Sequence, residues 1–451
     1  MVCPLDYRYG RKTMKEIFSE ESRLEHLLLV EAALARAHAK VGNIPVKAAN
    51  TITHKASLKY ISLETVKAIE AETKHDLMAV VRALTQECGS AGSYVHLGAT
   101  SYDIVDTAIA LQISSAIGEL ENSLKNTIQN LVALSKKHID TIMLGRTHGQ
   151  AALPITFGLK MSVFAMEFFR HLERLDSAKE QICVGKFSGA VGTGAALGKD
   201  ALKIQELVMT DLGLGIELAA TQIVSRDRHI EFIGVLCNIS ASAEKLATEF
   251  RNLQRSELLE VAEAFDVNTQ VGSSTMAHKR NPITSENISG LARIVRSFII
   301  PTYENAIQWH ERDLANSSSE RFIIPHTCIL VDDILFKLSD LLQNLQVFPE
   351  NMRKNLESAG DHIMAESVMQ ALTSKGVARD EAYRIVRKAA LDNSSGLGYK
   401  DALLGNKLVK KTLTEPELDY ALDPKNYLGS SQKVVKEMEK IINRSRLIRS
   451  S

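Results

Sequence analysis

Prolines are nearly absent from the middle of this 451-residue chain. None lies between Pro45 and Pro154 or between Pro154 and Pro282, and both tracts are rich in Leu, Ala, Glu and Lys. Proline is rare inside helices, whereas those four residues favour them. The two tracts therefore predict an all-α protein built from long helices.

Apolar residues recur along these tracts at alternating steps of three and four, which is typical of helices that pack along one another. One such seam comprises Ile113, Ile117, Leu120, Leu124, Leu131 and Leu134, and a second comprises Phe232, Leu236, Ile239, Ala243, Leu246, Phe250 and Leu253. From Leu236 onward, the second lies in a stretch without Gly or Pro, residues 235–271. We expect a helix of about 35 residues there, roughly 50 Å long. Both seams indicate a long bundle extended by association of subunits.

Shorter patterns complete the expected architecture. Helices are predicted at residues 20–41, 63–87, 155–175, 285–300 and 328–345, with smaller helices after residue 350. The length suggests two or three domains. The patterns change near residues 102 and 350, so we expect an N-terminal helical part (1–102), a central long-helix bundle (103–350) with a polar loop at 271–287, and a small C-terminal helical part (351–451).

Composition limits the compartment and the partners. Lys plus Arg and Asp plus Glu both total 54, which gives no indication of binding to nucleic acid or a membrane. The five cysteines are far apart and show no CxxC spacing, which argues against a disulfide framework or a zinc site. Neither a secretory signal nor a membrane span is visible. We expect a soluble, cytoplasmic protein.

The polar loop at 271–287 is unusual for a connector between two strong helical patterns. Gly272, Ser273 and Ser274 supply backbone N–H groups and hydroxyls, and Lys279 adds positive charge. Successive N–H groups in a turn can bind an anion. An ordinary polar surface loop and a site for an anionic substrate are both consistent with these residues.

Two histidines stand beside glycines in other expected loops. His148 lies in a Gly-Arg-Thr-His-Gly turn, and His96 precedes Thr100 in the loop before the first seam. A lone histidine is more often structural, but an accessible one beside a cation is a reasonable proton donor. Helix capping would explain Ser101 or Asp103, but not His96.

Arginines gather near serines or tyrosines in two further places. Arg8 and Tyr9 open the chain, and Arg312 and Arg321 bracket three serines that begin at Ser317. Guanidinium and hydroxyl groups match phosphate oxygens, although a solvated charged face is the alternative. The glycine-rich stretch 185–198 lacks the spacing of a P-loop, and we interpret it as a connection between helices.

Taken together, the Gly-Arg-Thr-His-Gly turn and the Ser-Ser-x-Met-x-x-Lys-x-Asn-Pro pattern at 273–282 resemble the fumarase and aspartase superfamily, most closely its adenylosuccinate lyase branch. Companion segments at 73–76, 100–103, 225–229 and 309–313 resemble that branch in the same order. The match thins only in the last hundred residues. Ala277 stands where the family usually has proline, which puts the rigidity of the loop in doubt.

The resemblance implies a three-domain fumarase/aspartase-like fold whose central bundle forms a twenty-helix core in a homotetramer, with active sites shared between three subunits. It also implies β-elimination of fumarate from adenylosuccinate and from SAICAR, two small-molecule substrates, without a metal or other cofactor. Argininosuccinate lyase, aspartase or fumarase would share the serine loop. A non-catalytic helical scaffold is the alternative of a different class.

The family's residue roles carry over by position. Ser273 is then the general base, His148 the general acid and Glu286 the partner of that histidine. His75 and His96 hold the substrate, Asp76 belongs to the same binding set, and Lys279 stabilises the serine alkoxide. The remaining implied contacts are Thr100, Ser101, Gln222, Lys279 and Asn281 for the succinyl carboxylates, and Arg8, Tyr9, Arg312, Ser317 and Arg321 for the ribose phosphate.

Overall fold

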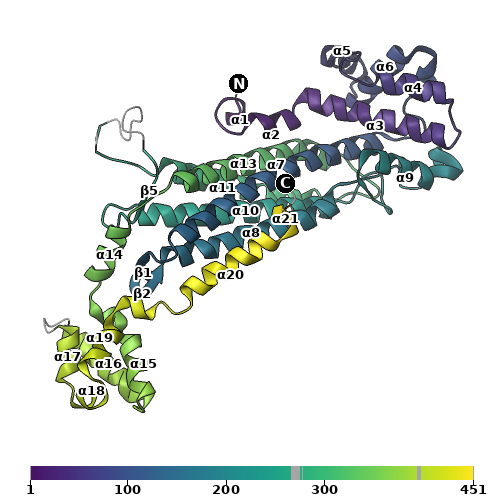
Figure 1. The fold of residues 1–451 in the computed structure, drawn as a ribbon. Helices are drawn as coiled ribbons and strands as arrows, with labels where there is room; N and C mark the ends of the chain where they lie inside the picture. The colour runs from purple at the N-terminus through teal and green to yellow at the C-terminus, as the bar shows by residue number, and fades with distance from the viewer. Residues whose placement is uncertain (1, 266–274, 277, 394–397, 450–451) are drawn as a thin grey trace. The chain divides into compact units, whose positions relative to one another are not determined.

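The computed structural model describes residues 2–265, 275–276, 278–393 and 398–449 (Figure 1). The chain divides into two compact units. Unit 1 comprises Met1–Lys125, Arg170–Glu244 and Ile288–Lys337, and unit 2 comprises Asn126–Phe169, Lys245–Asn287 and Leu338–Ser451.

Most elements lie wholly within one unit. Unit 1 holds α1 (Pro4–Tyr7), α2 (Lys12–Ile17), α3 (Glu20–Lys40), α4 (Val46–Lys55), α5 (Leu63–Thr73), α6 (Asp76–Cys88), η1 (Gly89–Tyr94), β3 (Val184–Gly185), η2 (Ala195–Asp200), α9 (Ala201–Leu212), β4 (Gly215–Ile216) and α12 (Ile299–Glu304). Unit 2 holds β1 (Ile142–Thr147), β2 (Gln150–Thr156), β5 (Val261–Ala262), β6 (Gln346–Val347), α14 (Pro349–Ser358), η3 (Asp361–Met364), α15 (Ala365–Ser374), α16 (Arg379–Asn393), α17 (Tyr399–Gly405), α18 (Lys407–Thr412), α19 (Glu415–Leu422), η4 (Pro424–Tyr427), α20 (Ser431–Arg444) and α21 (Arg446–Arg449).

Five of the described helices contribute residues to both units. They are α7 (Ser101–Lys137), α8 (Phe157–Ile182), α10 (Asp227–Leu253), α11 (Ile283–Ser297) and α13 (Ala315–Asn344). Within the described part of the chain, strands form only three two-stranded sheets. The predicted all-α class is confirmed.

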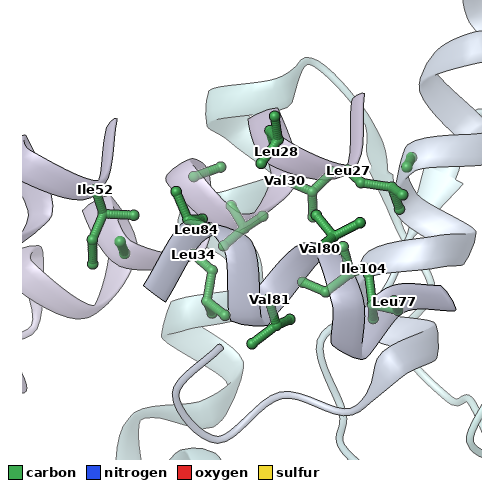
Figure 2. Packing of buried hydrophobic residues seen from close by; sticks show 14 of the residues in the cluster. Leu27, Leu28, Val30, Leu34, Ile52, Leu77, Val80, Val81, Leu84 and Ile104 are labelled. Carbon is green, nitrogen blue, oxygen red and sulfur yellow. The ribbon is translucent and has the colours of Figure 1, made fainter. Parts of the chain in front are cut away.

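The N-terminal part of unit 1 has its own apolar core. Figure 2 shows residues of α3, α4, α6 and the start of α7 packed together, among them Leu27, Ile52, Leu84 and Ile104. Helix α3 begins where Ser19 accepts a hydrogen bond from the Ser22 amide at 3.1 Å, an ordinary N-cap. This core fixes the ends of α3, α6 and α7, where candidate site residues lie.

Polar contacts tie the long helices of unit 1 to one another. Lys179 on α8 bonds Glu121 on α7 at 3.1 Å, and the Ser123 hydroxyl on α7 donates to Asp332 on α13 at 3.0 Å. The α8–α10 and α10–α11 pairs are joined by the contacts His171–Ser242 and Arg296–Glu244. The first-seam residues Ile113, Ile117, Leu120 and Leu124 are fully buried, as the pattern predicted.

Two predicted helices are interrupted or shorter. The helix expected at 63–87 is wrong as one element, because Lys74 is left-handed (φ 54°) and separates α5 from α6. The 35-residue helix expected from Val235 is also wrong, since α10 ends at Leu253. The chain then turns into β5, which pairs with β6, and Glu260 turns toward Arg146. A stretch without Gly and Pro permits a helix but does not require one.

The last long helix starts earlier than predicted. Helix α13 begins at Ala315 rather than near residue 328, and it contains Pro325. Because proline has no N–H, the carbonyl of Arg321 receives no helical hydrogen bond from it.

In unit 2, the C-terminal helices α15 to α19 pack around a separate buried cluster that includes Val368, Leu403 and Leu418.

Candidate functional site

A pocket of about 800 Å³ in unit 1 gathers much of the predicted substrate-binding set. Its walls come from α3, α5, α6, the start of α7, the segment before α10 and the start of α13. The predicted residues among its lining are His75, Asp76, Thr100, Ser101, Gln222, Arg312, Ser317 and Arg321. Motifs separated by up to hundreds of residues in the sequence therefore meet in one cavity.

His75 sits at the break between α5 and α6. Left-handed Lys74 turns the chain, and the His75 side chain then caps α6 by accepting from the Met78 amide at 3.3 Å. Its Nδ1 lies 3.8 Å from Oδ1 of Asp76. The break explains how neighbouring His and Asp residues both reach the pocket, which a continuous helix would not allow.

Asp76 is held by two arginines. Its Oδ2 accepts from Nη2 of Arg23 at 3.0 Å and from Nη2 of Arg321 at 2.8 Å, and its Oδ1 accepts from the Leu77 amide. Burial alone would raise the pKa of Asp76, but Arg23 and the other donors lower it below its usual range. Asp76 therefore binds the phosphate candidate Arg321 directly.

Arg312 stacks on Tyr102 at another wall of the pocket. Cζ of Arg312 lies 3.4 Å from the centre of the Tyr102 ring. Nη1 of Arg312 donates to Oε1 of Gln222 at 2.8 Å, and the Tyr102 hydroxyl donates to Oγ of Ser317 at 3.2 Å. Three predicted binding residues, Gln222, Arg312 and Ser317, are thus linked around one aromatic ring.

The loop that carries Thr100 and Ser101 is fixed by a buried carboxylate. Asp103 accepts from the Thr100 amide at 2.8 Å and from the amides of Ser188 and Gly189. The Nζ of Lys186 also contacts it, and both side chains are fully buried. The glycine-rich connection therefore has a structural role here, since its amides and Lys186 hold Asp103.

A second buried network lies beneath the pocket wall. Arg226 donates to Asp106 on α7 and to Glu320 on α13 at distances of 2.8–3.1 Å. Burial would lower the pKa of Arg226, but the two carboxylates raise it well above its usual value. This network joins α7, the segment before α10 and α13.

Three predicted residues of unit 1 do not line this pocket. His96 is left-handed (φ 60°), and its Nδ1 lies 2.6 Å from Oε1 of buried Glu31. Burial would lower the pKa of His96, yet the Glu31 carboxylate raises it above its usual value. Arg8 is exposed, and Tyr9 lies under Lys337, whose Nζ is 5.0 Å from the ring centre.

His148 lies at the tip of a β-hairpin in unit 2. Thr147 pairs with Gln150, so His148 and Gly149 form a two-residue loop in which both have positive φ, 54° and 75°. Such loops match the twist of a hairpin. The loop leaves His148 exposed.

Arg146 anchors the base of this hairpin. Its Nη1 and Nη2 donate to Oε2 and Oε1 of Glu260 at 3.0 and 2.8 Å, and Asn355 donates to Oε1 of Glu260 at 2.9 Å. The Glu260 side chain is fully buried. Arg146 thus holds the hairpin in place instead of presenting its charge to a ligand.

The remaining predicted residues lie in or beside the polar loop. Ser273 is outside the described residues. Lys279 and Glu286 are exposed, Asn281 is half-buried, and all three belong to unit 2. Helix α11 begins at Ile283 and carries Glu286 in its first turn, where Glu263 accepts the amides of Thr284 and Ser285 at 3.0 and 2.8 Å.

Comparisons with known proteins bear directly on these motifs. Residues 7–297 match the family described as "Lyase", and residues 361–438 match "Adenylosuccinate lyase C-terminus". The adenylosuccinate lyase of Methanothermobacter thermautotrophicus is 47% identical over 97% of this chain and 98% of its own length. The chain belongs to the adenylosuccinate lyase family.

Other relatives agree with this family assignment. The adenylosuccinate lyase of Pyrococcus horikoshii is 48% identical over 97% of both chains. A crystal structure of a fumarate lyase from Mesorhizobium sp. BNC1 has a TM-score of 0.88 and 34% identity, and the match covers 97% of this chain and 98% of that one. The fumarase/aspartase fold is therefore confirmed, and the protein is a lyase.

Sequence reasoning missed several residues of the pocket in this family member. Arg23 and Glu320 occupy ordinary helical positions, where a charged residue usually faces solvent. Backbone conformation offers a better signal. Five described non-glycine residues have positive φ, and all but Leu259 lie in segments singled out from the sequence: Lys74, His96, His148 and His310. Such strained conformations cluster at functional sites.

Two features are absent from the described residues. No group of three or more His, Cys, Asp or Glu side chains is placed to hold a metal ion. None of the described helices is both long and apolar enough to cross a membrane.

Proposed function

We propose that the protein catalyses β-elimination of fumarate from adenylosuccinate, giving AMP, and from SAICAR, giving AICAR. The observation that carries the proposal is the pocket of unit 1, in which Arg312, Arg321 and Ser317 lie with Gln222, Thr100 and Ser101. Guanidinium forks and hydroxyls suit a phosphate, and amide and hydroxyl donors suit carboxylates. The family membership of the chain supports the same substrates.

The elimination needs a base that removes a proton from carbon and an acid that donates a proton to the leaving nitrogen. Ser273, as an alkoxide, takes the proton from the carbon beside a succinyl carboxylate. The C–H electron pair forms the C=C bond of fumarate, and the C–N pair leaves with nitrogen, which takes a proton from His148. Glu286 orients His148, and Lys279 stabilises the alkoxide and the charge that develops on the carboxylate. The exposed hairpin tip at His148 supports this role, because the acid must reach the leaving nitrogen.

The proposal assigns the other binding residues as follows. His75 and Asp76 adjoin the phosphate, Arg8 and Tyr9 also bind it, and Asn281 binds a succinyl carboxylate. His96 holds the substrate as an imidazolium, which its contact with Glu31 supports.

Assembly and location belong to the same proposal. We place the active protein in a cytoplasmic homotetramer with a twenty-helix core, with three domains at 1–102, 103–350 and 351–451 and active sites that draw on three subunits. Exposed apolar side chains on α12, α13 and the segment between them, including Ile300, Ile307 and Phe322, support an association surface. The unpaired cysteines are consistent with a reducing compartment.

Complementation between two inactive variants tests both the residue roles and the shared sites. Ser273→Ala and His148→Gln would each be purified, shown to fold by circular dichroism, and assayed for fumarate release alone and after mixing under conditions that exchange subunits. Each variant alone should be inactive, and the mixture should regain activity if the base and the acid come from different subunits. Full activity in either single variant would refute its assigned role, and an inactive mixture despite proven subunit exchange would refute the shared site.

A further inference from the structure

We propose that Tyr102 is a positioning residue that holds Arg312 and Ser317 in place for the phosphate of the substrate. This inference rests on the proposed function, whose phosphate-binding set includes both residues. Tyr102 lies in the second position of α7 and lines the pocket.

The stacking contact orients the guanidinium of Arg312. With Cζ 3.4 Å from the ring centre, the cation lies directly over the face of Tyr102. An aromatic face attracts a guanidinium through its quadrupole and restricts the guanidinium's tilt. Without that face, the long arginine side chain would sample many rotamers before binding an anion.

The other contacts of Arg312 leave one guanidinium nitrogen, Nη2, for a ligand. Nε donates to the Asp313 carbonyl at 3.1 Å and Nη1 donates to Gln222 at 2.8 Å. Nη2 is covered and has no hydrogen-bond partner within the described part of the chain. A covered guanidinium N–H without a partner is costly. A small movement of a flat, pre-oriented guanidinium would satisfy Nη2 with a phosphate oxygen.

The hydroxyl of Tyr102 extends the arrangement to a second phosphate candidate. It donates to Oγ of Ser317 at 3.2 Å, which leaves the Ser317 hydroxyl hydrogen to point elsewhere. One side chain therefore fixes an arginine through its ring and a serine through its oxygen. Both groups present donors to the same cavity.

Binding of AMP and of adenosine, measured by calorimetry, tests the proposal without requiring turnover. Tyr102→Leu should weaken AMP binding about tenfold, between the values for an exposed and a desolvated cation–π contact, while adenosine binding stays unchanged. Tyr102→Phe keeps the ring and should weaken AMP binding only about threefold, as for one neutral hydrogen bond. Tyr383→Leu, an exposed tyrosine on α16, is the matched control and should change neither affinity.

Two further measurements separate positioning from other roles. For adenylosuccinate, Tyr102→Leu should raise KM by the same factor as it weakens AMP binding and leave kcat nearly unchanged. In an Arg312→Ala background, Tyr102→Leu should weaken AMP binding only about threefold, through the lost contact with Ser317. The proposal is overturned if adenosine binding weakens equally, if the two substitutions act additively, or if the wild-type protein does not bind AMP. AMP binding that follows these expectations without turnover of adenylosuccinate would instead refute only the proposed elimination.

Discussion

Arg226 donates two parallel hydrogen bonds to Asp106, from Nη1 to Oδ2 at 2.8 Å and from Nη2 to Oδ1 at 2.9 Å. Both side chains are buried, and Arg226 also binds Glu320, which directly precedes Arg321 on the pocket wall. The pair therefore connects the beginning of α7 to the part of α13 that carries Ser317 and Arg321.

Asp106→Asn should destabilise the protein, because it leaves part of a buried guanidinium without its charged partner. The free energy of unfolding should fall by on the order of 3 kcal/mol. Asp211→Asn, which affects the partly exposed Arg36–Asp211 pair, is the control and should cost less than about 1 kcal/mol. Urea unfolding measures the free energy of unfolding of both variants. An equal loss in the two variants would contradict the importance of the buried pair.

His229 should make stability depend on pH. Burial, reinforced by Arg226, lowers the pKa of His229 to about 4, so the folded protein keeps this histidine neutral. In the unfolded chain, the imidazole of His229 has the ordinary histidine pKa of about 6.5. The contribution of neutral His229 to the free energy of unfolding is therefore fully present above about pH 6.5. It is lost as the pH falls toward about 4, and the total loss is on the order of 3 kcal/mol.

His229→Gln removes that titration and supplies the comparison. Stability curves of the wild type and the variant, measured by urea unfolding from pH 7 to pH 4, should differ in slope across this window, with the variant flatter. Parallel curves would show that His229 does not titrate differently in the folded and unfolded states.

Lys186→Met should be far more disruptive than the same change at an exposed lysine. Lys186 is fully buried against Asp103, which would be left with a charge balanced only by backbone amides. We expect a loss of about 3–5 kcal/mol in the free energy of unfolding. Lys203→Met, in a solvent-exposed pair with Glu206, should change it by less than about 0.5 kcal/mol. A Lys186 variant as stable as the Lys203 variant would contradict this account.

Arg146→Lys should lower turnover through the hairpin that carries His148. Lysine cannot reproduce the two-pronged contact with Glu260, so the hairpin loses an anchor while the charge remains. We expect kcat for adenylosuccinate to fall about tenfold with little change in KM, since a misplaced proton donor affects the chemical step. Arg353→Lys, in an exposed helical pair, is the control. An unchanged kcat would show that Arg146 does not position His148.

The fold was largely predictable because long helices leave a strong periodic signal. Ile117 and Leu120 on α7 and Phe232 and Leu236 on α10 are fully buried, as their spacing indicated. The break at Lys74 was not predictable in the same way, since lysine carries no preference for a left-handed conformation. Tertiary contacts fix that break, and they are invisible to local patterns.

The site was predictable as a set of motifs but not as a geometry. The sequence singled out Asp76 and Arg321, yet only the structure shows that they bind each other, together with Arg23. The hairpin beneath His148 was also missed, although a two-residue loop ending in Gly149 is compatible with one. Ser273 was identified by its motif alone, and its placement lies outside the described residues.

Fumarate release is the most direct test of the central claim. The purified protein would be supplied in parallel with adenylosuccinate, argininosuccinate and aspartate, and fumarate would be followed by its ultraviolet absorbance. We predict rapid release from adenylosuccinate and none from the other two. Release only from argininosuccinate or aspartate would contradict the assignment of the pocket to a nucleotide phosphate, and no release from any of them would contradict the proposed activity.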